Sequence, residues 1–312
     1  MKSISKNTDN KAPLLSGEII AAFGRRFEVQ LDDGTSLECV TRAKKSEYAC
    51  GDKVSIRQTS SNEGVIESVE ERSTLLYRSD LYKEKLIAAN IDQIVFVLAT
   101  KPSYSEELLS RCLVAAEAEK IKPLIVLNKS DLVEETANAL ANLAWLKDLN
   151  YSLITLSARQ SIAPLLPYLQ DKLSLLIGQS GMGKSTIINT LIPDARAKIN
   201  EVSEVLDSGK HTTTNARVYS INPTSRIIDS PGLQEFGLFH IADDEIAHAF
   251  PEFRSYLGQC RFYNCLHLSE PGCVISEQAE KGLIRLNRLV LYRKIISAHK
   301  AWRLTRKTKG EL

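Results

Sequence analysis

Residues 178–185 have the composition and spacing of a phosphate-binding loop, Gly178-x-x-x-x-Gly183-Lys184-Ser185. Glycines at these positions let backbone N–H groups surround phosphate oxygens at the start of a helix, where the helix dipole favours anions. Lys184 is expected to reach the β- and γ-phosphates, and Ser185 to ligate Mg²⁺. A buried strand before the loop and a helix over residues 186–191 argue against a chance glycine-rich turn. The predicted phosphate contacts are Gly178, Gln179, Ser180, Gly181, Met182, Gly183, Lys184, Ser185 and Thr186.

A second motif, Asn128-Lys129-x-Asp131, follows a predicted strand and could recognise the base. The Asp131 carboxylate can accept hydrogen bonds from the N1–H and the exocyclic amino group of guanine, a pair of donors that adenine lacks. Alone, such a motif could equally be an exposed helix cap. Together with the phosphate loop and with Ser157-Ala158, which also stands at a strand end, it predicts a guanine nucleotide, GTP or GDP.

A third motif, Asp229-Ser230-Pro231-Gly232, follows the phosphate loop. Asp229 is expected to hold the Mg²⁺ shell, and the Gly232 backbone N–H to contact the γ-phosphate. The order along the chain is therefore base, phosphate, switch, whereas an ordinary GTPase has the phosphate loop before the base-recognition motif. This order predicts a circularly permuted GTPase, which is physically allowed because the termini of a compact domain often lie close together.

Residues 210–214, Lys-His-Thr-Thr-Thr, lie where a switch loop would supply a threonine ligand to Mg²⁺, and Thr213 is the best single candidate. A threonine run could instead be the edge of a strand. Leu233 follows Gly232, where many GTPases carry a glutamine that orients water. We therefore expect His211 or a partner to position the water, which makes His211, Lys184 and Thr213 the predicted catalytic residues.

Four residues near the C-terminus have the spacing of a metal site, Cys260-x4-Cys265-x-His267-x5-Cys273. Three thiolates and one imidazole complete the closed tetrahedral shell of structural zinc, with no position left for catalysis. The alternative is that these cysteines are small buried apolar residues. The other three cysteines, Cys39, Cys50 and Cys112, are scattered, and we expect them to be structural.

These motifs need supporting strands and helices, and the hydrophobic pattern supplies them. Residues 16–70 read as five short strands, with a tight turn at Asp33-Gly34, and favour a small closed barrel of either OB-fold or SH3-like type. Farther on, buried apolar runs alternate with helical stretches, which predicts a doubly wound α/β domain. The runs are residues 94–98, 124–127, 153–156 and 173–177, and the helical stretches are residues 106–120 and 134–149.

The overall composition is that of an ordinary globular protein, with 312 residues, 43% hydrophobic residues and a net charge of +2. Ten lysines and arginines lie between Lys281 and Gly310 without an Asp or Glu, so the basic character is local. With Trp302, this tail suits a nucleic-acid backbone, although a solvated face or a membrane-surface helix remains an alternative. No apolar run approaches the roughly 18 residues of a bilayer span, so we expect a cytoplasmic protein.

The motifs resemble those of the RsgA (YjeQ/YloQ) family of ribosome small subunit-dependent GTPases, in the order NKSD, GQSGMGKS, GKHTTT, DSPGLQEFGL and CRFYNCLHLSEPGC. The resemblance implies an N-terminal OB-fold, a permuted GTPase domain and a C-terminal zinc domain that act late in assembly of the small ribosomal subunit. It also implies slow GTP hydrolysis that the subunit stimulates, with His211 as the assisting histidine. Ser230 and Met182 depart mildly from the family pattern, where Thr and Val are usual, and neither removes a ligand.

We therefore expect an α/β protein with a tail at 1–13, an OB-fold barrel at 14–75, a GTPase domain at 76–240 and a mostly helical zinc domain at 241–312. Its cofactors would be GTP or GDP, Mg²⁺ and one structural zinc. Its partners would be the small ribosomal subunit and its rRNA, with no membrane, and the chain would be a monomer. Two rivals are an RNA-binding assembly factor that barely hydrolyses its nucleotide and a P-loop ATPase acting on metabolites, which Asp131 argues against.

Overall fold

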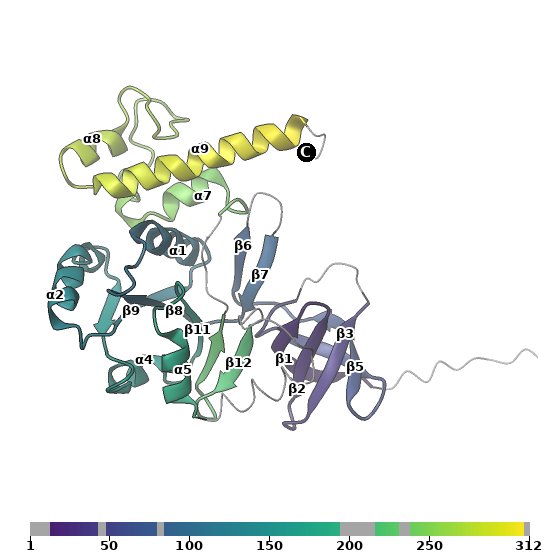
Figure 1. Ribbon diagram of the computed structural model, residues 1–312. Helices are drawn as coiled ribbons and strands as arrows, with labels where there is room; N and C mark the ends of the chain where they lie inside the picture. Colours follow the sequence, from purple (N-terminus) through teal and green to yellow (C-terminus); the bar gives the residue numbers. More distant parts are fainter. Residues whose placement is uncertain (1–12, 43–47, 80–83, 194–215, 231–237, 309–312) are drawn as a thin grey trace, which may run out of the picture.

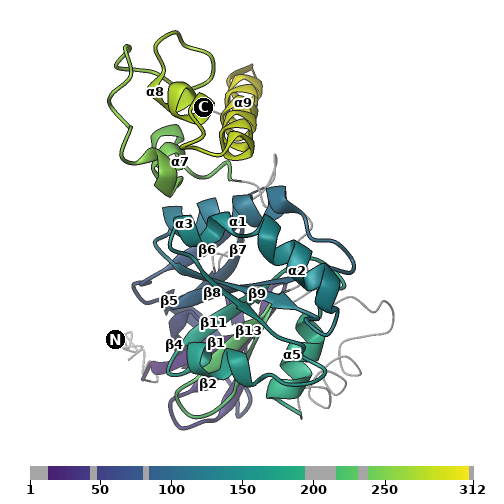
Figure 2. The same ribbon diagram turned by 90° about the vertical axis from the view of Figure 1, so that its left-hand side faces the viewer.

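The computed structural model describes residues 13–42, 48–79, 84–193, 216–230 and 238–308, and they form three parts (Figure 1). A β-barrel and an α/β domain lie side by side, and a helical C-terminal part covers one side of the α/β domain (Figure 2). No helix in these ranges combines the length and the apolar character that crossing a bilayer requires.

Five short strands close the N-terminal barrel: β1 (Leu15–Phe23), β2 (Arg26–Leu31), β3 (Ser36–Thr41), β4 (Lys53–Gln58) and β5 (Glu63–Val69). Their pairing order is β1-β2-β3-β5-β4, and β4 pairs with β1 to complete the ring. All pairs are antiparallel except β3 with β5. Alternate side chains, such as Phe27, Val29 and Ile56, point into a buried core. The topology confirms an OB-like barrel.

The α/β domain is built on six further strands: β8 (Gln93–Ala99), β9 (Lys122–Asn128), β10 (Ser152–Thr155), β11 (Leu173–Ile177), β12 (Arg217–Ser220) and β13 (Arg226–Asp229). Their order is β10-β9-β8-β11-β13-β12, parallel except for β12. β8 and β11 are buried along their whole length, as apolar strands at the centre of a parallel sheet should be. Because β11 lies beside β8, motifs that are separated in sequence reach the same edge.

Helices cover both faces of this sheet. One face carries α1 (Glu106–Ala118) and α3 (Trp145–Asp148), and the other carries α4 (Leu166–Leu169) and α5 (Lys184–Leu191) (Figures 1 and 2). The helix α2 (Val133–Asn142) follows β9, and a short 3-10 turn, η1 (Ala163–Leu165), leads into α4. Two apolar cores result, one on each side of the sheet.

The barrel continues the sheet of the α/β domain, since β1 pairs with β12 at Ala21 and Arg217. The Arg217 guanidinium lies 2.9 Å from a Glu28 carboxylate oxygen of the barrel. A separate hairpin, β6 (Leu75–Ser79) and β7 (Glu84–Ala89), connects the two parts.

The C-terminal part contains α7 (Asp243–His248), η2 (Pro251–Phe253), α8 (Val274–Glu280) and α9 (Leu286–Thr308). In its core Phe250 stacks on Phe253, and Tyr292 meets both rings edge to face, with ring centroids 4.9–5.5 Å apart. It meets the acidic face of α1 through basic side chains: Arg285 with Glu106 at 3.3 Å, Lys294 with Glu107 at 3.1 Å and Arg254 with Glu117 at 2.6 Å.

The expected fold class is confirmed, including the five barrel strands, the doubly wound sheet and the helical C-terminal part. Two details differ from the sequence prediction. Residues 134–149 form two helices, because α2 ends with Leu143 as its C-cap and α3 begins at Trp145. The hairpin of β6 and β7 was not anticipated as a separate element. The expected N-terminal tail falls almost entirely on residues 1–12, outside the described ranges.

Candidate nucleotide site and metal centre

The phosphate loop leaves β11 and enters α5 with a backbone that only glycine fits. Gly183 has φ +97°, and a Cβ at this position would lie 2.2 Å from Asn128 Nδ2. A Cβ on Gly178 would lie 2.4 Å from the Val97 carbonyl oxygen. Asn128 and strand β8 therefore pack closely against the phosphate loop, and a side chain at either glycine would displace them.

Lys184 and Asp229 place opposite charges beside this loop. Lys184 Nζ donates to the carbonyl oxygens of Gly178 at 2.6 Å and Gln179 at 3.1 Å. Asp229 ends β13, which pairs with β11, so its carboxylate reaches the same edge. Burial lowers the pKa of Lys184, and burial raises the pKa of Asp229 to about 6, while the attraction between the two groups partly offsets both shifts. An anionic phosphate beside Lys184 and a cation beside Asp229 would favour the charged forms.

The buried side chain of Asn128 connects three loops by hydrogen bonds. Its side-chain Nδ2 donates to the Met182 carbonyl oxygen at 3.0 Å, and its Oδ1 accepts from the Ala158 backbone N–H at 3.0 Å. The residue is only 2% exposed, so these bonds replace water at both of its polar atoms. The base-recognition motif, the phosphate loop and Ser157-Ala158 are thus held in one arrangement.

The base-recognition residues lie at the rim of the same site. Lys129 adopts φ +64°, and its Nζ donates to the carbonyl oxygens of Gly181, at 2.7 Å, and Lys101. The Asp131 carboxyl is exposed, and the nearby Ser157 hydroxyl is the main cause that lowers its pKa. Asp131 is therefore ionised at neutral pH and able to accept the two donors of a guanine.

These loops surround a pocket of about 680 Å³. Of the residues expected to bind nucleotide, it is lined by Asn128, Lys129, Asp131, Ser157, Ala158, Ser180, Gly181, Gly183, Lys184, Ser185, Thr186 and Asp229. Gly178, Gln179 and Met182 belong to the loop but do not line the pocket. Gln179 instead directs its side-chain oxygen to the Ser105 backbone N–H, at 2.7 Å, beside the start of α1.

Lys101, Leu132 and Arg159 also line the pocket and were missed by sequence reasoning. Arg159 directly follows Ser157-Ala158, and Lys101 stands just past the end of β8, so position after a parallel strand was the available signal. Ser230, noted only as a departure from the family pattern, lines the pocket as well. The predictions for His211, Thr213 and Gly232 lie outside the described residues.

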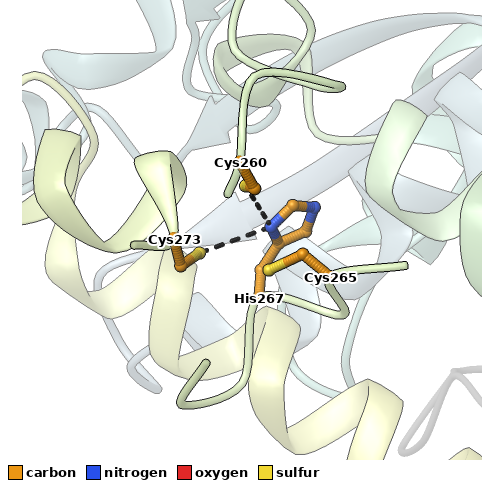
Figure 3. A group of neighbouring side chains, drawn as sticks. All are labelled: Cys260, Cys265, His267 and Cys273. Carbon is orange, nitrogen blue, oxygen red and sulfur yellow. Dashed lines mark hydrogen bonds between the residues drawn. The ribbon is translucent and has the colours of Figure 1, made fainter. Parts of the chain in front are cut away.

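The four predicted metal ligands come together in the C-terminal part (Figure 3). Their ligand atoms all lie within 4.8 Å of one another. His267 Nδ1 faces the sulfurs of Cys260 at 3.5 Å and Cys273 at 3.4 Å. Zinc bonds of about 2.3 Å to sulfur and about 2.0 Å to nitrogen give a tetrahedron whose sulfur–nitrogen edges are roughly 3.5 Å. The cluster therefore fits zinc in both chemistry and spacing, with Nδ1 as the imidazole ligand.

Residues around the cluster fix the loop that carries His267. The Glu270 carboxylate accepts three backbone N–H groups, from Leu266 at 3.1 Å, Leu268 at 2.8 Å and Ser269 at 3.1 Å. Arg293 of α9 donates to the His267 carbonyl oxygen at 3.0 Å. His267 itself is buried and adopts φ +58°. Such supporting bonds orient the ligands before a metal arrives.

The basic tail is less available to a nucleic acid than its sequence suggests. Of the tail cations whose side chains the structure describes, five bond within the protein: Arg285, Arg288, Arg293, Lys294 and Arg303. The Arg288 guanidinium is buried against Glu252 at 2.6 Å, and Trp302 packs on Phe239 with centroids 5.6 Å apart. Lys281 and Lys300 are exposed. Part of the predicted RNA-binding charge therefore holds the C-terminal part together.

Comparison with known proteins agrees with these sites. The family model for the RsgA GTPase matches residues 69–239. A protein of Nitrosospira multiformis named small ribosomal subunit biogenesis GTPase RsgA is 53% identical over 287 residues, which cover 92% of each chain. A Nitrosomonas europaea protein of the same name is 46% identical over 301 residues, covering 96% of each chain.

Two solved structures have the same architecture. YjeQ from Thermotoga maritima superposes with a TM-score of 0.70 at 27% identity, covering 92% of this chain and 99% of its own. YloQ, described as a circularly permuted GTPase, gives a TM-score of 0.66 at 25% identity, covering 94% and 97%. With the motif order, the permuted sheet and the Cys3His cluster already established, the chain belongs to the RsgA family of circularly permuted GTPases.

Proposed function

We propose that this chain binds the small ribosomal subunit and hydrolyses GTP to GDP and phosphate during late maturation of that subunit. Nucleotide binding is supported chiefly by the hydrogen bonds of Asn128. These bonds hold the base-recognition motif, the phosphate loop and Ser157-Ala158 around one pocket. The ribosomal part rests on the relatives, which are named for small-subunit biogenesis and match nearly the whole chain.

In this proposal, the carboxylate of Asp131 selects guanine, and Lys184 with the backbone of the phosphate loop binds the β- and γ-phosphates. Ser185 and Thr213 would ligate Mg²⁺, and Asp229 would hold the Mg²⁺ shell. Mg²⁺ supplies charge neutralisation to the phosphates when it is bound. The protein residues position and desolvate the reacting groups, which is the main contribution of the enzyme in phosphoryl transfer.

Hydrolysis also needs an ordered water, and Leu233 cannot orient one. We propose that His211 does so when the chain is bound to the subunit, and that the Gly232 backbone N–H contacts the γ-phosphate. Slow turnover alone and fast turnover on the subunit would follow.

We further propose that the barrel at 14–75, the GTPase domain at 76–240 and the zinc domain at 241–312 act as separate contact modules for rRNA. The protein would act as a cytoplasmic monomer. Zinc would hold the C-terminal module in its folded form, because only the folded chain presents the Cys3His shell and metal binding therefore stabilises it.

The main alternative is an RNA-binding assembly factor that binds GTP but barely hydrolyses it, and the leucine at position 233 is what favours it. Binding of GTP and ATP analogues separates a GTP site from an ATP site, and GTP turnover with and without small subunits separates the GTPase from the factor that barely hydrolyses its nucleotide. The proposal expects a preference for GTP that Asp131→Asn shifts towards xanthosine triphosphate, because the amide offers a donor where guanine also has one. Unchanged base preference in that variant would remove Asp131 as the guanine-recognising residue.

A further inference from the structure

Residues 261–264, Arg-Phe-Tyr-Asn, form four consecutive exposed positions between two of the metal ligands, and we call them the aromatic loop. The Tyr263 side chain is fully exposed and that of Phe262 is 42% exposed. No other large apolar or aromatic side chain in the described ranges is as exposed as Tyr263. Two adjacent aromatic rings in water are unfavourable for the isolated protein, and such exposed apolar surface marks a candidate recognition site.

The support beneath the aromatic loop is rigid. Cys260 and Cys265 bracket it, and both belong to the metal cluster. The Cys265 N–H donates to the Phe262 carbonyl oxygen at 3.2 Å, and the Arg261 N–H donates to the Gly272 carbonyl oxygen at 3.0 Å. The two rings are therefore presented from a fixed turn, and a ligand would not bear the entropic cost of ordering that turn.

The chemistry of the loop fits an unpaired nucleic-acid base. The Arg261 guanidinium lies 5.6 Å from the Phe262 ring centroid, which places a planar cation beside a flat apolar surface. Flat rings stack on bases, arginine contacts phosphates or stacks on bases, and the exposed amide of Asn264 can bond to a base edge.

The charge around the aromatic loop is also compatible with a nearby phosphate backbone. No Asp or Glu occurs from residue 255 to residue 269. The next acid, Glu270, uses its carboxylate on three backbone N–H groups of its own loop. A protein partner would be expected to meet a contiguous apolar patch, whereas these two rings are flanked by Arg261 and Asn264. Much of the coil between η2 and α8 runs above α9 in Figure 1, on the side opposite α7 and α1.

We propose that Tyr263 and Phe262 stack on an unpaired base of RNA, with Arg261 beside the backbone. Bases in a duplex are already stacked on each other, so the aromatic loop selects single-stranded RNA or a base that projects from a loop or bulge. This inference rests on the proposed function, because it names a contact through which the zinc domain engages the rRNA of the small subunit.

Equilibrium binding to purified small subunits and to a single-stranded RNA oligonucleotide tests the proposal. Tyr263→Ala should weaken both affinities by about 5- to 150-fold, the usual effect of losing one base–aromatic stack. Tyr263→Phe keeps the ring and should bind within about twofold of wild type, on the same grounds. Tyr168→Ala is the matched control, since Tyr168 is a partly exposed tyrosine of α4, on the sheet face away from the C-terminal part, and should have no effect.

A spectroscopic variant reports stacking directly. In Tyr263→Trp, the added indole emission should be quenched by the single-stranded oligonucleotide and not by a duplex of the same length. Zinc content and GTP turnover without subunits should match wild type in every variant, which shows that the fold is intact.

Full affinity of Tyr263→Ala for both targets would overturn the proposal. So would loss of subunit binding without any quenching of Tyr263→Trp by RNA, because that combination indicates a ribosomal protein as the partner. The proposed function is tested separately by subunit-stimulated turnover in the wild type. If stimulation is present and Tyr263→Ala binds normally, the function stands and only the stacking contact is wrong.

Discussion

Replacing Asn128 with alanine should weaken nucleotide binding without changing base preference. The substitution removes the bonds to the Met182 carbonyl oxygen and from the Ala158 N–H, each 3.0 Å long. A net contribution of about 0.5–1.5 kcal/mol for each buried hydrogen bond gives a loss of about 1–3 kcal/mol. If the two bonds serve to keep the loops in their binding arrangement, the same free energy corresponds to about 5- to 150-fold in affinity.

The assay is titration with a fluorescent GDP analogue, combined with urea unfolding to measure stability. Asn142→Ala is the control, since Asn142 is exposed at the end of α2 and should change neither quantity. The variant at Asn128 should lose affinity for GDP and for xanthosine diphosphate by the same factor, because it loosens the loops and leaves Asp131 in place. A folded Asn128→Ala protein that binds GDP within about twofold of wild type would refute the proposed connection between the loops.

Three further predictions concern electrostatics, metal and chemistry. In nucleotide-free and Mg²⁺-free protein, the raised pKa of Asp229, about 6, means that the native state keeps a proton that the unfolded chain loses near pH 4. The free energy of unfolding should therefore fall by up to about 3 kcal/mol between pH 4 and pH 6, and Asp229→Asn should remove this fall. If urea unfolding shows the same pH dependence of stability for wild type and Asp229→Asn, this prediction is wrong. Cys273→Ser should reduce bound zinc well below the one equivalent expected for wild type and should lower the unfolding midpoint of the C-terminal part. Cys112→Ser is the control and should keep the metal. Elemental analysis that finds no zinc in wild type purified without chelator would exclude the site. His211→Ala should keep GTP affinity and subunit binding but lose most of the subunit-stimulated turnover, and undiminished stimulation would show that another group positions the water.

The chemistry of the site was predictable because it depends on local spacing. The phosphate loop needs glycines at fixed positions, and the clashes that a Cβ would make at Gly178 and Gly183 show the physical reason. The metal ligands were predictable for a similar reason, since Cys260, Cys265, His267 and Cys273 lie within one short segment. Their spacing alone limits how they can meet.

Contacts between distant segments were not predictable from a single sequence. Asn128 was expected at the nucleotide, but its bonds to Met182 and Ala158 depend on which strands become neighbours. The basic residues between Arg285 and Arg303 gave no sign that three of them would meet acids of α1 and α7, because a charge run has the same pattern whether its partners are nucleic acid or protein. The OB-like topology likewise required the pairing of β3 with β5.

GTP turnover by the purified protein, measured alone and with purified small ribosomal subunits, tests the central claim most directly. The large subunit serves as the control, and the Lys184→Ala variant measures any contaminating activity. We predict slow hydrolysis of GTP alone, strong stimulation by the small subunit and none by the large subunit. Equal turnover with and without small subunits would contradict the claim that this chain is a GTPase activated by the particle it helps to mature.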